Sequence, residues 1–155
     1  MALRSLLTLA TLLLATSAVA EQRTVRIDPA RSKVSFALGA TAHTVRGTFA
    51  VTSTELHFDS TAGTISGSIV VDAKSGDTGN GKRDATMHSD ILRTAAFSQI
   101  IFEPAALDGA IAATGESSLT VRGSMTLLGK AHTMSIPVKV GINGDRVTAR
   151  ASFDV

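Results

Sequence analysis

The chain has 155 residues, of which 15 are Lys or Arg and 13 are Asp or Glu, giving a formal net charge of +2 at pH 7. This near balance, with no run of Lys and Arg to follow a phosphate backbone, argues against nucleic acid as a partner. The sequence contains no cysteine, which excludes disulfides, thiolate catalysis and thiolate metal sites. It also contains no Trp or Tyr, which argues against an outer-membrane barrel with aromatic girdles.

The first twenty residues have the pattern of a secretory signal peptide. Arg4 supplies a short positive region, and the apolar run from Leu6 to Leu14 is too short to span a bilayer as a helix. Ala18 and Ala20 place small residues at the two positions that a signal peptidase inspects. We therefore predict cleavage after Ala20 and export to the periplasm or the exterior, with no membrane span. Residues 21–155 would form one domain of net charge +1, because Arg4 is the only charged residue of the leader.

After the leader, apolar and polar residues alternate with a period of two, which is typical of strands that bury one face. This alternation predicts strands over residues 34–38, 45–51, 65–71, 119–127, 134–142 and 147–153. Turn signals such as Asp108-Gly109 and Asn143-Gly144-Asp145 separate some of them. Gly67 and Gly123 stand in the middle of apolar faces, where glycine indicates a tight bend or coil of the sheet. Long, coiling antiparallel strands usually close on themselves, so the predicted fold is an all-β barrel.

One stretch breaks the alternation. From residue 81 to 96 the apolar residues Met87, Ile91, Leu92 and Ala95 recur at helical spacing. We predict a short amphipathic helix there, preceded by a loop over residues 75–80. Such a helix would cap one end of the barrel.

Short motifs along nearly the whole mature chain resemble, in order, those of the YceI-like, polyisoprenoid-binding family. They are Asp28-Pro29 with Ser32, Val34 and Phe36; Gly47-Thr48-Phe49; Thr78-Gly79-Asn80 with Arg83-Asp84; Ile101-Phe102; Val121 to Leu127 with Gly129; and Ile136-Pro137-Val138. The resemblance implies a lipocalin-like, eight-stranded antiparallel β-barrel in the periplasm with an isoprenoid lipid in its interior. The chain departs from the family pattern at Arg31, where the family has His. Family members also continue beyond Val155, which leaves open whether the barrel closes without a further C-terminal segment.

Most of the inward positions are Val, Ile, Ala or Gly, and such small residues predict a cavity inside the barrel. An eight-stranded barrel is just wide enough to hold one slender apolar ligand there. The alternative is a solid apolar core. Arg83 and His88 lie near the start of the predicted helix, where they would contact a polar head group; the alternative is a charge pair of Arg83 with Asp84 and a solvated His88. The predicted ligand-binding residues are Phe36, Phe49, Phe58, Ile69, Val71, Met87, Ile91, Phe102, Val121, Met125, Leu127, Ile136, Val138, Arg83 and His88.

We predict a periplasmic protein that holds an isoprenoid, a quinone or a similar long amphiphilic lipid for carriage or storage, with no catalytic residues, metal or resident cofactor. No nucleophile elbow, HExxH frame or phosphate loop appears in the sequence. One alternative is a metal-binding protein that uses His43, His57, His88 and His132. Another is a barrel module with a protein partner and no ligand. The oligomeric state stays open, and an unpaired sheet edge would favour a homodimer.

Overall fold

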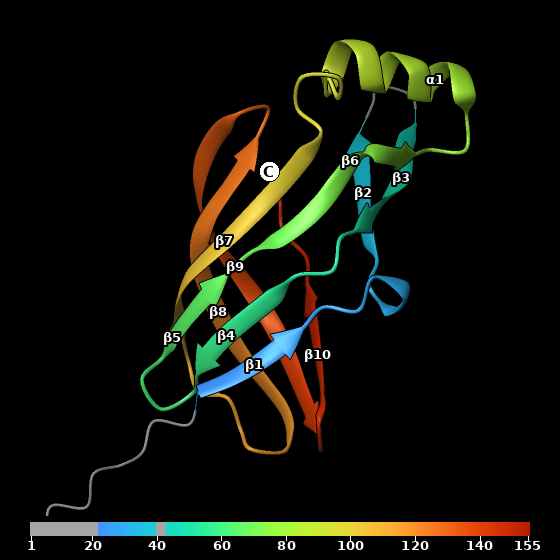
Figure 1. Cartoon of the computed structure of the whole chain (residues 1–155). Helices are drawn as coiled ribbons and strands as arrows, with labels where there is room; N and C mark the ends of the chain where they lie inside the picture. Colours follow the sequence, from blue (N-terminus) through green and yellow to red (C-terminus); the bar gives the residue numbers. More distant parts are fainter. Residues whose placement is uncertain (1–21, 40–42) are drawn as a thin grey trace, which may run out of the picture.

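The computed structural model describes residues 22–39 and 43–155, so the predicted leader over residues 1–20 lies outside the described residues. These residues form one curled antiparallel sheet with a short helical segment across one end, called here the upper end (Figure 1). The predicted all-β class with a short capping helix is confirmed. Within the described ranges, no helix is long and apolar enough to cross a membrane.

The sheet contains ten strand segments in the described part of the chain, compared with the eight expected. The strands are β1 (Gln22–Arg26), β2 (Val34–Gly39), β3 (Thr44–Val51), β4 (Glu55–Asp59), β5 (Thr64–Gly67), β6 (Ile69–Asp77), β7 (Gln99–Asp108), β8 (Gly115–Leu127), β9 (Lys130–Asn143) and β10 (Arg146–Ala151). A 3-10 turn, η1 (Pro29–Arg31), joins β1 to β2. The last strand ends at Ala151 rather than at residue 153, and Phe153 beyond it is 41% exposed.

Strand β7 divides the sheet. Its first half pairs with β6, where Phe102 lies opposite Ile69, and its second half pairs with β5, where Ala106 lies opposite Thr64. One leaf therefore continues as β6-β3-β2 and the other as β5-β4-β1. Along its other edge β7 pairs with β8, and the sheet continues through β9 to β10.

The sheet curls into a half-barrel. In the described part of the chain, β10 pairs with β9 alone, and neither β1 nor β2 pairs with β10. Figure 1 shows the resulting shape, with the turns β4–β5, β7–β8 and β9–β10 at the end opposite α1, called here the lower end.

The strand predicted over 65–71 is two strands, because the chain bends at Gly67. This residue has a φ of +106°, and a Cβ there would lie 2.3 Å from the carbonyl oxygen of Glu55. Both the left-handed backbone and the close approach require glycine. The bend predicted at Gly67 is confirmed, and it lets β5 and β6 join different leaves of the sheet.

The helical segment is shorter than predicted. It consists of α1 (Gly81–Thr86) and one π-helical turn, η2 (Met87–Ile91), so the expectation that it reaches residue 96 is wrong. Asn80 begins the helix, with its side-chain oxygen accepting a hydrogen bond of 3.0 Å from the backbone N–H of Arg83. Arg93, with a φ of +49°, turns the chain away soon after the helix, and Phe97 N–H then donates to the Arg93 carbonyl at 2.9 Å.

The loop predicted over 75–80 begins later than expected, because β6 extends to Asp77 through an irregular register with β3. Ser75 stabilises this irregularity. Its hydroxyl donates to the carbonyl of Asp72 at 2.6 Å and accepts a hydrogen bond of 2.7 Å from the backbone N–H of Ala50. Such bulges increase the local twist of a sheet, and this one curves β6 and β3 toward the upper end.

Candidate ligand-binding site

The lower half of the concave face is packed. Six side chains from four strands form one cluster, called here the lower cluster: Phe58, Leu107, Leu119, Val121, Val140 and Ile142, all between 5% and 8% exposed. The strand registers place several of these residues together, since Leu107 lies opposite Val121. The lower cluster is the part of the molecule that resembles an ordinary protein core.

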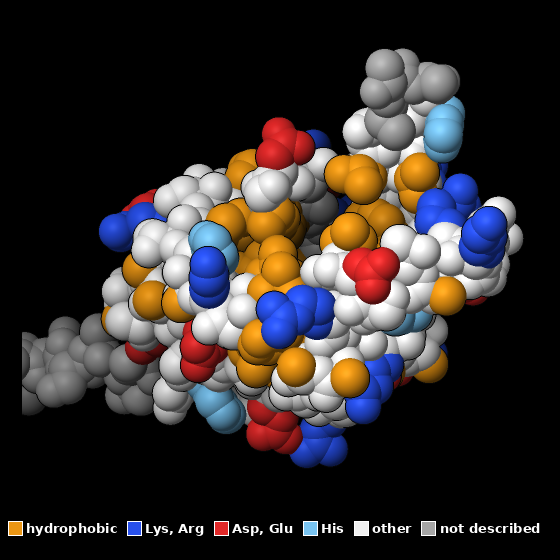
Figure 2. Space-filling view, turned by 90° about the horizontal axis from the view of Figure 1, so that it is seen from above, with side chains coloured by type: hydrophobic (Ala, Val, Ile, Leu, Met, Phe, Trp, Pro, Cys, Tyr) orange, Lys and Arg blue, Asp and Glu red, His pale blue; other side chains and the backbone are white. Residues whose placement is uncertain are grey.

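The upper half of the concave face is apolar but more open. It is called here the upper apolar face and consists of Val34, Phe36, Phe49, Val51, Val71, Ala73, Met125 and Ile136. Ile136 lies at its border, because it is opposite Val121 of the lower cluster. Val51, Val71, Ala73, Met125 and Ile136 are between 2% and 8% exposed, whereas Val34 and the two phenylalanines are only partly buried. Figure 2 looks onto the upper end and shows hydrophobic side chains around a hollow in the middle of this face.

Two phenylalanine rings form one wall of the upper apolar face. The ring centroids of Phe36 and Phe49 lie 5.1 Å apart at an angle of 33°. Each ring occupies space that glycine leaves free, because a Cβ at Gly47 would lie 2.4 Å from Cζ of Phe36, and one at Gly76 would lie 2.7 Å from Cε1 of Phe49. These glycines allow the rings to lie flat against the sheet.

A third ring is seated in the same way between the two halves. Phe102 lies opposite Met125 in the register of β7 and β8, and a Cβ at Gly123 would lie 2.8 Å from Cζ of Phe102. Gly123 also meets backbone, since that Cβ would lie 2.4 Å from the carbonyl oxygen of Glu103. Gly123 therefore marks a close approach of two strands.

The helical segment places Met87 and His88 over the upper end of β6. The terminal methyl of Met87 would be 2.8 Å from a Cβ at Gly76, and Nε2 of His88 lies 2.9 Å from the Gly76 carbonyl oxygen. A carbonyl can only accept, so this contact assigns the proton to Nε2. Nδ1 of His88 is buried and has no hydrogen-bond partner among the described residues.

Arg83 and Asp84 both hold the loop that leads into the helix. The Arg83 side chain donates to the hydroxyl of Thr78 at 2.8 Å and to its carbonyl oxygen at 3.0 Å. Asp84 accepts from the backbone N–H of Thr78 at 3.0 Å and from its hydroxyl at 2.5 Å. The hydrogen bond from the Thr78 side chain lowers the pKa of the Asp84 carboxyl below its ordinary value of 3.8. The guanidinium and the carboxylate therefore meet at Thr78.

The remaining predicted residues divide between the two halves. Phe58, Phe102, Val121 and Val138 belong to the lower cluster or pack against it. Ile69 lies opposite Phe102 on the concave face, and Leu127 follows Met125 by two positions on β8. Ile91 lies apart from these residues, because it is 62% exposed at the end of the helical segment.

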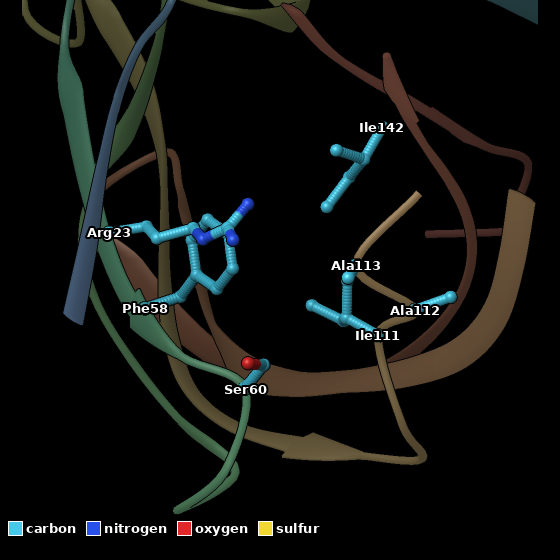
Figure 3. A pocket seen from close by; sticks show the side chains of 7 residues that line it. All are labelled: Arg23, Phe58, Ser60, Ile111, Ala112, Ala113 and Ile142. Atoms are coloured by element: carbon cyan, nitrogen blue, oxygen red, sulfur yellow. The ribbon is translucent and has the colours of Figure 1, made fainter. Parts of the chain in front are cut away.

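A small cavity at the lower end is lined by a cation, Arg23, that the sequence analysis did not predict as a site residue. The cavity measures about 70 Å³ and is lined by Arg23, Phe58, Ser60, Ile111, Ala112, Ala113 and Ile142 (Figure 3). Arg23 lies directly opposite Phe58 in the β1–β4 register and points into the cavity. The alternation of Arg23, Val25 and Ile27 is the signal that could have identified β1. A lipid tail is far larger than this space, so the cavity is not the tail site.

The four histidines do not converge. His57 contacts the hydroxyl of Thr24 through Nδ1 at 2.9 Å on the convex side, His88 contacts Gly76, and His43 and His132 lie exposed near the upper end. Across residues 22–39 and 43–155, no three His, Asp or Glu side chains are placed to hold a metal ion. The geometry gives no support to the histidine-metal alternative.

The YceI-like domain matches residues 26–155. The chain belongs to the YceI-like family. Its fold is similar to that of a solved YCEI protein. No curated protein matches the sequence. BcnA from Burkholderia cenocepacia is 26% identical with a TM-score of 0.65, over 81% of this chain and 77% of BcnA.

Two further structures share the fold of this YceI-like chain at lower identity. A polyisoprenoid-binding domain from Saccharophagus degradans, implicated in plant cell wall breakdown, is 16% identical with a TM-score of 0.53, over 85% of this chain and 70% of that domain. The YCEI protein of Campylobacter jejuni is 17% identical with a TM-score of 0.51, over 74% of this chain and 67% of that protein.

Proposed function

We propose that this YceI-like protein holds an isoprenoid or a similar long apolar lipid in the upper half of its interior, and does so in the periplasm after removal of the leader. The observation that carries the proposal is the contrast between the two halves of the concave face. The lower cluster is packed to the exposure of a normal core, whereas Phe36 and Phe49 point inward yet stay partly exposed. The likeness to a polyisoprenoid-binding domain supports the same class of ligand.

The energetics favour a long tail. Burying one methylene contributes about 0.8 kcal/mol, so a five-carbon isoprene unit contributes roughly 4 kcal/mol. Association costs on the order of 4–15 kcal/mol in lost freedom, so about two to four buried units offset it. Burial of this kind is non-directional and selects for length and slenderness rather than for one head group.

The predicted ligand residues take different parts in this proposal. Phe36, Phe49, Val71, Met125 and Ile136 contact the tail, and Met87 lies beside Phe49 where it covers the tail from above. Phe58 and Val121 support the site from the lower cluster without touching the lipid. Arg83 and His88 hold the helical segment through Thr78 and Gly76, and a head group would meet this segment at the edge of the hollow. No step in this function requires a catalytic residue.

The proposal is tested by native mass spectrometry of protein secreted into a bacterial periplasm and purified without detergent, followed by identification of the released compounds. We expect one isoprenoid or quinone per chain, or a matching mass shift when polyprenol is added. A matched pair of variants localises the site, because Val71 faces the concave side and its neighbour Val70 faces the convex side. Val71→Ala should weaken lipid binding and Val70→Ala should not. A bare polypeptide that ignores added lipid would contradict the proposal and favour a module with a protein partner.

A further inference from the structure

Large exposed hydrophobic side chains are concentrated at two places on the described surface. They are Leu38 at 63%, Ile91 at 62%, Phe153 at 41% and Val155 at 77%. Phe153 and Val155 belong to the last residues of the chain, beyond β10. Leu38 and Ile91 lie at the upper end, one near the end of β2 and the other at the last residue of the helical segment. The open end of the half-barrel therefore presents apolar side chains to solvent on two sides.

Exposed cationic side chains belong to the elements of the same end. Lys82 in α1, Arg93 just after η2 and Lys130 at the start of β9 are all exposed. The Arg93 guanidinium lies 5.4 Å from the ring centroid of Phe97, which restricts its position. His43 and His132 are exposed at the same end.

The acidic side chains of the upper end are engaged within their own loops. Asp77 accepts from the Gly79 N–H at 2.7 Å, Asp84 from Thr78, and Asp90 from the Ser89 hydroxyl at 2.7 Å. The lower end has Asp59 and Asp108 as the last residues of β4 and β7 and Asp145 in the β9–β10 turn. Arg122 pairs with Asp108 there at 2.6 Å, and Arg146 is exposed at the start of β10. The upper end is thus the end with outward-pointing cations and exposed hydrophobic residues together.

We propose that the upper end docks on the surface of an anionic phospholipid membrane, with Leu38 and Ile91 entering the interface and Lys82, Arg93 and Lys130 meeting the head groups. A membrane fits this surface because both kinds of side chain are spread around the hollow rather than gathered into one patch (Figure 2). Fluid head groups can meet separated cations, and shallow insertion requires only single apolar side chains. Docking in this orientation brings the opening of the upper apolar face against the lipid.

The test measures co-sedimentation with vesicles of one part phosphatidylglycerol to three parts phosphatidylcholine, and with vesicles of phosphatidylcholine alone. Wild type and variants are expressed with the same N-terminus, so that its contribution is common to all. The docking variant combines Lys82→Gln, Arg93→Gln and Lys130→Gln. The matched control removes as many exposed cations away from the upper end, by Arg31→Gln, Lys33→Gln and Lys139→Gln.

Each basic side chain near an anionic surface changes binding by about fivefold, so the docking variant should bind the phosphatidylglycerol vesicles on the order of a hundredfold more weakly. A second variant, Leu38→Ser with Ile91→Ser, should lose roughly tenfold on the same vesicles. The control should retain most of the binding, and 0.5 M salt should weaken wild type and control alike because it screens surface charge.

Equal binding by wild type and docking variant, equal losses in the docking variant and the control, or no binding to any vesicle would overturn the proposal. So would a protein partner that cross-links at residues 38 and 91 in the absence of vesicle binding. The lipid content of the same preparations by native mass spectrometry is a separate readout. Loss of docking with retained lipid refutes this proposal alone, whereas a chain that docks but never holds lipid refutes the proposed function alone.

Discussion

Two phenylalanine-to-alanine substitutions should separate the packed half of the interior from the open half. Phe58 is 6% exposed within the lower cluster, so Phe58→Ala leaves a cavity and should cost about 3–5 kcal/mol of unfolding free energy. Phe36 is only partly buried and contacts Phe49 at one side, so Phe36→Ala should cost about 1–2 kcal/mol. Lipid binding should show the opposite order, with Phe36→Ala about tenfold weaker and Phe58→Ala close to wild type.

The unfolding free energies are measured by urea titration of lipid-free protein, and lipid binding by native mass spectrometry with added polyprenol at a temperature where both variants are folded. A difference of about 2 kcal/mol corresponds to roughly 4–8 °C in melting temperature for a domain of this size. Equal losses of stability in the two variants would refute the division into halves. A fall in lipid binding for Phe58→Ala as large as that for Phe36→Ala would place the lipid at the lower end instead.

Three further predictions concern single residues. Gly123→Ala should lower the unfolding free energy by about 2–3 kcal/mol, because the added Cβ would meet backbone atoms. The control Gly141→Ala should lower it by under about 1 kcal/mol, because its Cβ would meet only the Thr148 hydroxyl. Equal urea midpoints for the two variants would contradict this prediction. Because the pKa of Asp84 is lowered in the folded state, its contribution to stability is present above about pH 4 and is lost as the pH falls through the folded-state pKa. Asp84→Asn should therefore flatten the dependence of unfolding free energy on pH in this range. An unchanged slope would argue against this role of Asp84. Arg150→Val removes a charge from the exposed strand β10, so sedimentation should show more self-association than in wild type; a monomer at all concentrations would count against an exposed pairing edge.

The sequence predicted the strands well where the signal is local. Alternation over residues 45–51, 119–127 and 134–142 lies within β3, β8 and β9, since a strand with one buried face repeats every two residues whatever its partners are. Strand β1 was not predicted, because Val25 is its only apolar residue and Arg23 occupies an inward position. The helix prediction ran too far because Leu92 and Ala95 continue the helical spacing, while the left-handed backbone of Arg93 ends the segment.

The pairing of the strands could not be predicted in the same way. Strand β7 pairs with β6 at one end and with β5 at the other because the chain bends at Gly67. A glycine in the sequence indicates a bend but not which strands pair on either side of it. Alternation also identified the inward positions of the site without saying which were packed. Phe36 and Phe58 have the same pattern in sequence, but only Phe58 lies among residues from three other strands. The roles of Arg83 and His88 as anchors of the helical segment likewise depend on Thr78 and Gly76 being near in space.

The division of the sheet at β7 gives the molecule two leaves whose local opening need not coincide. In the sheet, the β6-β3-β2 leaf and the β5-β4-β1 leaf are joined only by β7. The chain itself crosses between them at residues 27–33, 52–54 and 68, and the apolar contacts of the lower cluster lie on the side of the second leaf. Local opening is easiest where few buried contacts are lost, so the first leaf can swing outward on β7 while the second stays folded. Entry and release of a bulky lipid then require only local opening of the β6-β3-β2 leaf, at a free-energy cost below that of global unfolding.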